Sequence, residues 1–138
     1  MLKVRNQLPA VHPQFGHPFD TSTHLHGSAS LPQYDGYASD VTPSGYVKDY
    51  HYPNFQPART LWYHDHGVHF TAQNAYGGLA AQYHLHDPVE RALLPQGEFD
   101  VPITITRKSD NNLTGTIGNG GCKLDLARSN GNITITRE

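Results

Sequence analysis

The chain has 138 residues, of which 36% are hydrophobic and 16% are charged, and its formal net charge is −2 with the histidines neutral. This balance excludes the strongly basic surfaces that bind nucleic acid or anionic lipid, and no apolar run approaches the roughly 20 residues of a membrane span. Thirteen glycines and ten prolines disfavour long helices, so we expect a turn-rich β architecture of one domain with a short appendage.

Alternating and β-prone stretches, separated by glycine and proline, predict a series of short strands. The clearest of them is Arg-Thr-Leu-Trp-Tyr-His-Asp-His, residues 59–66, which ends before Gly67. Loops are expected at 9–20 and 30–47, and one helical turn at 70–77. The predicted strands, in chain order, are residues 2–7, 21–27, 48–55, 59–66, 79–86 and 99–107.

The composition changes after Lys108. Three short alternating runs follow, at residues 113–117, 123–127 and 132–136, with glycine- and asparagine-rich turns between them. The tail contains no histidine and no aromatic residue. We therefore divide the chain into a domain at 1–107 and a β-meander tail of different origin at 108–138, in which we see no chemistry.

The chain start and the single cysteine leave the localisation open. Residues 1–6 lack the apolar core of a signal peptide. Cys122 is the only cysteine, so no intrachain disulfide can form and no redox compartment is indicated.

Ten histidines are the unusual feature of the composition, and four of them form two pairs with the same spacing. His24-Leu25-His26-Gly27 and His64-Asp65-His66-Gly67 each lie at the end of a predicted strand. Residues i and i+2 of a strand share a face with their Cα atoms about 6.5–7 Å apart, so such a pair can hold one metal or reach two. Four neutral imidazoles suit copper, zinc, iron or nickel, and their binding should weaken below about pH 6.

A single His-x-His pair in a chain with ten histidines does not distinguish a metal site from a structural role. Two pairs, each followed by a glycine that keeps side chains away from the metal, favour a metal site.

The residues around both pairs resemble a known family. Trp62-Tyr63-His64-Asp65-His66-Gly67 and Thr23-His24-Leu25-His26-Gly27 resemble the two histidine motifs in the first domain of multicopper oxidases, most closely those of the spore-coat laccase and bilirubin oxidase branch. The resemblance covers residues 1 to about 107 and implies an all-β, cupredoxin-like Greek-key β-sandwich that is incomplete at its N-terminus. Further matching segments follow in order, at residues 5–9, 35–37, 50–54, 74–80, 86–88, 94–95 and 98–102.

The resemblance also implies roles for the matching residues. His24 would ligate the type 2 copper of a trinuclear cluster, and His26, His64 and His66 would ligate the type 3 pair. Asp65 would orient these ligands or assist proton movement while O₂ is reduced to water. Phenols or similar one-electron donors would be the substrates.

The other candidate residues are expected to be structural. Trp62 and Tyr63 should pack around the site, and a third His-x-His pair, His84 and His86, falls where the family has a strand end. We further expect His51 to pack, and His12 and His17 to be solvated in a loop. His69 follows His66 by three residues, within reach of the metal region, but it is not counted among the expected ligands.

Two departures from the family limit the expected activity. A blue copper site needs a cysteine, two histidines and a weak axial ligand, but Cys122 lies in the tail and no histidine follows His86. Further cluster ligands would have to come from another cupredoxin domain or chain. The family also has more strands ahead of the one that ends at Asn6. We therefore expect little or no laccase activity from the isolated chain.

Three other classes of metalloprotein use comparable sets of histidines. A cupin needs a glutamate shortly after its His-x-His pair, but the first glutamate after His26 is Glu90. A metallo-β-lactamase needs an aspartate at the position of Val68, together with α/β helices. A non-enzymatic copper- or zinc-binding cupredoxin module, or an inactive fragment, remains open as the alternative to an enzyme domain.

Overall fold

The computed structural model describes residues 1–100, 103–108, 112–117, 122–129 and 132–135. The chain forms two compact units, Met1–Asp87 and Pro88–Glu138. None of the helices within these ranges has the length and apolar character needed to cross a membrane.

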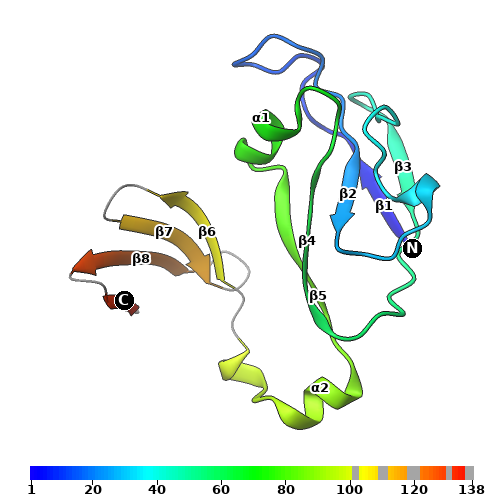
Figure 1. Ribbon diagram of the computed structural model, residues 1–138. Helices are drawn as coiled ribbons and strands as arrows, with labels where there is room; N and C mark the ends of the chain where they lie inside the picture. The colour runs from blue at the N-terminus through cyan, green and yellow to red at the C-terminus, as the bar shows by residue number, and fades with distance from the viewer. Residues whose placement is uncertain (101–102, 109–111, 118–121, 130–131, 136–138) are drawn as a thin grey trace. The chain divides into compact units, whose positions relative to one another are not determined.

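Two antiparallel sheets make up the strands of the first unit. One sheet pairs β1 with β3, and the other has the order β2-β4-β5, so that β4 is its central strand (Figure 1). The predicted all-β, antiparallel class is confirmed. The strands are β1 (Leu2–Arg5), β2 (Thr23–His26), β3 (Val47–Tyr50), β4 (Arg59–Asp65) and β5 (Ala80–Leu85).

The apolar core of this unit joins its two sheets. Leu25 of β2 and Leu61 of β4 are buried against Tyr50 and Tyr52, which lie at the end of β3 and just after it. Strand alternation places Leu25 on this side of the sheet and the flanking His24 and His26 on the other. Burying one leucine side chain stabilises the fold by roughly 1.5–3 kcal/mol, so the core anchors the strands that carry the histidines.

Short helical segments lie in the connections of the first unit. The 3-10 helix η1 (Pro32–Tyr34) lies in the loop expected at 30–47, and this loop is fixed by a bridge between Thr21 and Thr42. The helical turn expected at 70–77 is α1 (Thr71–Tyr76), which packs against β4.

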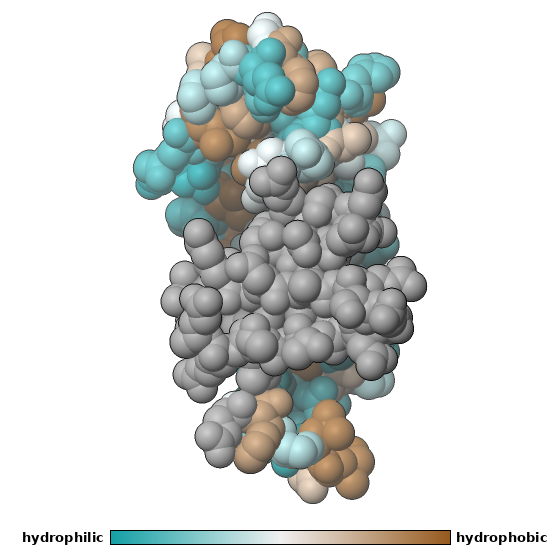
Figure 2. Space-filling view, turned by 90° about the vertical axis from the view of Figure 1, so that its left-hand side faces the viewer, coloured by the Kyte–Doolittle hydropathy of each residue, from teal (hydrophilic) through white to brown (hydrophobic). Residues whose placement is uncertain are grey.

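The second unit begins with a helix where the sequence suggested only a polar loop. This helix, α2 (Pro88–Leu93), has proline at its first position, where a missing N–H costs no hydrogen bond. The 3-10 helix η2 (Gly97–Phe99) follows it. At the lower end of Figure 2, where α2 lies, hydrophobic surface gathers, and Val89, Leu93 and Leu94 are all exposed.

A four-stranded antiparallel meander of order β6-β7-β8-β9 completes the second unit. Its first strand, β6, was assigned from sequence to the preceding domain but pairs here with β7. The compact units therefore divide at residues 87/88, whereas the boundary predicted from composition lies at 107/108. A different origin for the tail stays a prediction. The strands are β6 (Ile103–Lys108), β7 (Asn112–Ile117), β8 (Cys122–Ser129) and β9 (Asn132–Ile135).

Candidate metal centre

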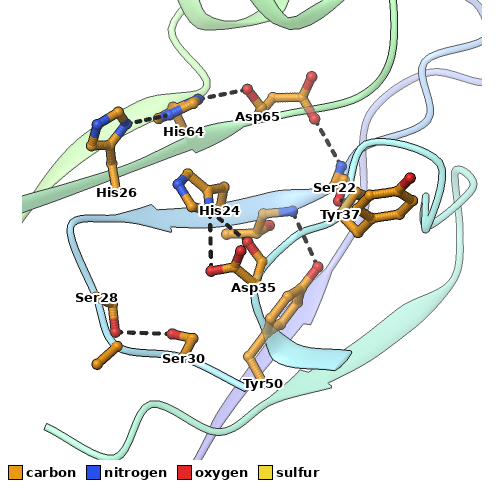
Figure 3. A network of polar contacts seen from close by, with 12 residues as sticks. Ser22, His24, His26, Ser28, Ser30, Asp35, Tyr37, Tyr50, His64 and Asp65 are labelled. Carbon is orange, nitrogen blue, oxygen red and sulfur yellow. Dashed lines mark hydrogen bonds and ion pairs between the residues drawn. The ribbon is translucent and has the colours of Figure 1, made fainter. Parts of the chain in front are cut away.

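The antiparallel pairing of β2 with β4 brings the two histidine pairs together. His24 lies directly opposite His64 in the ladder, and His26 lies opposite Trp62. His66 follows the end of β4, but its N–H donates to the carbonyl of Ser22 at 2.7 Å and keeps the backbone alongside β2. Figure 3 shows the rings of His24, His26 and His64 gathered on these two strands.

The imidazole rings are close enough to share metal ions. The ring centroid of His24 lies 5.5 Å from that of His26, 5.4 Å from that of His64 and 5.2 Å from that of His66. One ring nitrogen from each of His24, His26 and His64 lies within 4.8 Å of the others. The fourth ring, His66, has a buried Nδ1 for which the described residues provide no hydrogen-bond partner.

The shortest nitrogen pair in this cluster has the spacing of two ligands on one ion. Nδ1 of His26 and Nε2 of His64 are 3.3 Å apart. Metal–nitrogen bonds of about 2.0–2.1 Å at a tetrahedral angle place two ligand nitrogens about 3.3 Å apart. The donor set and its spacing therefore fit a metal ion bound by imidazole.

Backbone carbonyls select the tautomers of two of the rings. Nδ1 of His24 lies 2.5 Å from the carbonyl oxygen of Asp35, and Nδ1 of His64 lies 2.7 Å from that of Asp65. Since a carbonyl oxygen only accepts, each Nδ1 carries the hydrogen and each Nε2 keeps its lone pair. A hydrogen bond to the other ring nitrogen is the usual way in which a protein orients a histidine ligand.

The sequence pattern gives no sign of the part played by Asp35, although Asp35-Gly36-Tyr37 is one of the segments that match the family. Gly36 has a φ of +72°, and a Cβ at this position would lie 2.4 Å from the carbonyl oxygen of Thr23. Only glycine lets the loop lie this close to β2, and this approach brings the Asp35 carbonyl to His24.

Burial keeps His64 in the form that binds metal. The side chain is buried, and this burial lowers the pKa of His64 below its usual range, while the hydrogen bond to the Asp65 carbonyl raises it. The neighbouring His24, His26 and His66 lower this pKa further, because each would be a like charge when protonated. The ring is therefore neutral at neutral pH.

Asp65 lies between the paired histidines in sequence, but its carboxylate makes contacts away from their rings. It is only 3% exposed and accepts hydrogen bonds from the backbone N–H of Ser22 at 2.8 Å, from that of Gly67 at 3.1 Å and from Nδ2 of Asn74 at 2.9 Å. These bonds join the residue before β2, the turn after β4, and α1. Ser22 and Asn74, both fully buried, were not predicted as part of this network.

Trp62 packs beside the candidate centre, as expected of a structural residue, and stacks on His64 at 4.2 Å between ring centroids. The same expectation for Tyr63 is wrong, because Tyr63 lies on the other side of β4, where it lines a groove of about 570 Å³ between β1 and β5.

The remaining histidines lie outside the cluster. His84 contacts Gln82 at 2.7 Å, His51 packs edge-on against Tyr34, and His69 is exposed with a φ of 69°.

The expectation that His12 is solvated is wrong, because its side chain is buried and its Nδ1 accepts hydrogen bonds from the backbone N–H groups of Gln14 and Phe15. His17, also expected to be solvated, stacks on Phe70 with ring centroids 3.7 Å apart.

Comparison with known proteins identifies the family. The family model of multicopper oxidases matches residues 2–90, which include both histidine pairs. The chain belongs to the multicopper oxidase family. Copper is therefore the metal that the family implies for this cluster of imidazoles.

Several relatives in this family share the matched region. The chain is 55% identical over 103 residues to a bilirubin oxidase of Albifimbria verrucaria, covering 70% of this chain and 18% of that protein. It is 44% identical over 100 residues to a laccase of Bacillus subtilis (strain 168), covering 66% of this chain and 20% of that protein. A laccase of Haloferax volcanii is 34% identical over 111 residues, covering 72% of this chain and 19% of that protein. The chain thus spans about a fifth of the length of the relatives it matches.

Proposed function

We propose that this chain supplies half of a trinuclear copper cluster that reduces O₂ to water. In this proposal His24 holds the type 2 copper, and His26, His64 and His66 hold the type 3 pair. The observation that carries the proposal is the convergence of imidazoles from β2 and β4, with His26 Nδ1 only 3.3 Å from His64 Nε2.

The spacing of the nitrogens supports an assignment of ligands to ions. His26 and His64 share one ion of the type 3 pair, because their nitrogens have the separation of two ligands on one metal. His66 serves the second ion of this pair, and its buried Nδ1 has no hydrogen-bond partner among the described residues. His24, whose ring centroid lies 5.2–5.5 Å from those of the other three, presents Nε2 to the type 2 position.

Bound copper would supply the one-electron redox chemistry that O₂ reduction needs. The residues of this chain orient and maintain the ligands. The carbonyls of Asp35 and Asp65 fix the tautomers of His24 and His64, and burial keeps His64 unprotonated. The Asp65 carboxylate acts as a positioning group that holds Ser22, Gly67 and Asn74, since it accepts from all three.

Another cupredoxin domain or chain completes the cluster in this proposal. It contributes further histidines and the blue copper at which phenol-like donors deliver electrons. Cys122 is the only cysteine of this chain and lies in the meander, outside the unit that carries the histidines.

The test is copper reconstitution of the purified chain without O₂, followed by metal analysis, absorption and EPR spectra, and a phenol oxidation assay. We expect copper bound at the histidine cluster, no band near 600 nm and no turnover by the chain alone. Adding a domain that carries the remaining ligands should produce an EPR-silent coupled pair and O₂ consumption. A chain that binds no copper at neutral pH would contradict the proposal.

A non-enzymatic copper- or zinc-binding module is the alternative. The nitrogens of His24, His26 and His64 lie within 4.8 Å of one another, which is enough for a single ion without a second domain. The two proposals differ in stoichiometry. A module keeps one ion per chain whatever domain is added, and shows the EPR spectrum of an isolated copper.

A further inference from the structure

We infer that Trp62 is a positioning residue for the metal ligands, in that its indole stacks on His26 and His64 together and holds their rings ready for the ion. This inference rests on the proposed copper site. It goes beyond packing, because it attributes part of the copper affinity of the histidine cluster to the side chain of Trp62.

The strand register places Trp62 where it can reach ligands of both strands. Trp62 lies directly opposite His26 in the β2–β4 ladder and two residues before His64 on the same face of β4. Its ring stacks on His64 with centroids 4.2 Å apart and planes 27° apart, and on His26 with centroids 5.4 Å apart and planes 24° apart. One flat side chain thus stacks on both of the rings whose nitrogens lie 3.3 Å apart.

Stacking on Trp62 matters more for the orientation of His26 than for that of His24 or His64. A backbone carbonyl holds each of those two rings, whereas no described residue binds the exposed ring of His26 in this way. Stacking on Trp62 therefore sets the ring plane of His26. Ordering a ligand before binding removes an entropic cost that would otherwise weaken the complex.

Trp62 is not a core residue, so its contacts with the histidines are not a by-product of filling the core. The side chain is 40% exposed, and the core of the unit lies on the other face of β4, around Leu25 and Leu61. Tyr63 has almost the same exposure, 37%, and is the adjacent residue on that opposite face. It is therefore a matched control for removing a half-exposed aromatic side chain from β4.

The experiment compares the copper affinity of the full chain with those of Trp62→Leu, Trp62→Phe and Tyr63→Leu, measured by competition with a chelator. An aromatic pair contributes a free energy equivalent to roughly two- to tenfold in an equilibrium constant, so Trp62→Leu should bind copper about fivefold more weakly. Trp62→Phe should recover most of this loss, and Tyr63→Leu should bind as the unchanged chain does. EPR of the copper form should show altered hyperfine splitting for Trp62→Leu and not for Tyr63→Leu.

The outcomes distinguish the two proposals. Tight binding by the unchanged chain and equal binding by Trp62→Leu would overturn the positioning role and leave the copper site intact. Absence of binding by the unchanged chain would overturn both.

If Trp62→Leu does not fold, tryptophan fluorescence of the unchanged chain tests the inference instead. Trp62 is the only tryptophan, so stoichiometric Cu²⁺ should quench most of its emission, and unchanged emission with bound copper would overturn the inference.

Discussion

His26 Nδ1 lies 3.3 Å from Nε2 of His64, across two strands whose residues are 38 positions apart in sequence. Because Nδ1 of His64 already carries a hydrogen, its Nε2 can only accept, and His26 donates to it when no metal is bound. A metal ion shared by these two nitrogens would require the other tautomer of His26, in which the hydrogen lies on Nε2 and Nδ1 has a free lone pair. Metal binding at this pair would therefore replace the hydrogen bond between the two histidines.

Replacing His64 with glutamine should weaken copper binding by more than ~10-fold. The reason is that mutation of a residue that only orients a ligand already lowers metal affinity by about 10- to 100-fold, and His64 is proposed as a ligand itself. The measurement is a chelator competition titration at neutral pH. His84→Gln is the matched control, since His84 belongs to a third His-x-His pair and its ring contacts Gln82. Equal losses in the two variants would place the metal elsewhere.

Replacing Asp65 with asparagine should lower the free energy of unfolding by about 2–4 kcal/mol, since hydrogen bonds to a charged group contribute about 1.5–3 kcal/mol each. Asparagine has one acceptor oxygen where the carboxylate serves three N–H donors. Urea unfolding measures the change. Asp49→Asn breaks an exposed pair with Lys3 and should cost less than ~1 kcal/mol. A similar cost in both variants would contradict a central role for the Asp65 network.

Replacing Gly36 with alanine should destabilise the metal-free chain by about 1–3 kcal/mol more than replacing Gly45 does, and should also weaken copper binding. Both glycines have positive φ, +72° and +86°, so both substitutions carry the same backbone strain. Only at Gly36 would the added Cβ meet backbone, at 2.4–2.6 Å, and push the Asp35 carbonyl away from His24. Thermal unfolding and a copper titration of the two variants check this. Equal effects would show that the close approach to β2 is unimportant.

The metal-free chain should lose stability as the pH falls below about 6.5, the usual histidine pKa. The pKa of His64 is lowered in the folded state, chiefly by burial, so the unfolded chain binds a proton at a higher pH than the folded chain does. Protonation therefore favours unfolding, and the loss grows until the pH reaches the folded pKa. Urea unfolding at pH 7.5 and pH 5.5 should show a smaller decrease for His64→Gln than for His84→Gln. Identical decreases would assign the pH dependence to other groups.

Local patterns were sufficient to predict the strands and the pairing of the histidines. The period-2 alternation of 59–66 gave β4 to within one residue, and the two His-x-His pairs on strands made a shared face predictable. The convergence of His24 with His64 then required only that β2 and β4 be neighbours. The metal-binding roles themselves stay predictions.

Contacts that depend on tertiary structure could not be predicted in this way. The carbonyl of Asp35 reaches His24 through a close approach of loop and strand, and Asn74 reaches Asp65 from α1. His12 is buried because the segment around it closes through a Val11–Pro18 bridge, for which its loop-like composition gave no signal. In α2, Pro88 suggested a chain break, although proline is favourable at the first position of a helix.

The hydrogen-bond acceptors of His24 and His64 are main-chain oxygens, which every amino acid possesses, and Oδ1 of Asp35 lies farther from Nδ1 of His24, at 3.5 Å. Exchange of the Asp35 side chain therefore leaves the hydrogen-bond acceptor of His24 in place, provided that the backbone keeps its path. The harmful substitutions are expected at Gly36 instead, because this residue sets the path of the backbone and any side chain here would collide with β2. The orientation of these two rings therefore depends more on the course of the backbone than on the side chains beside it.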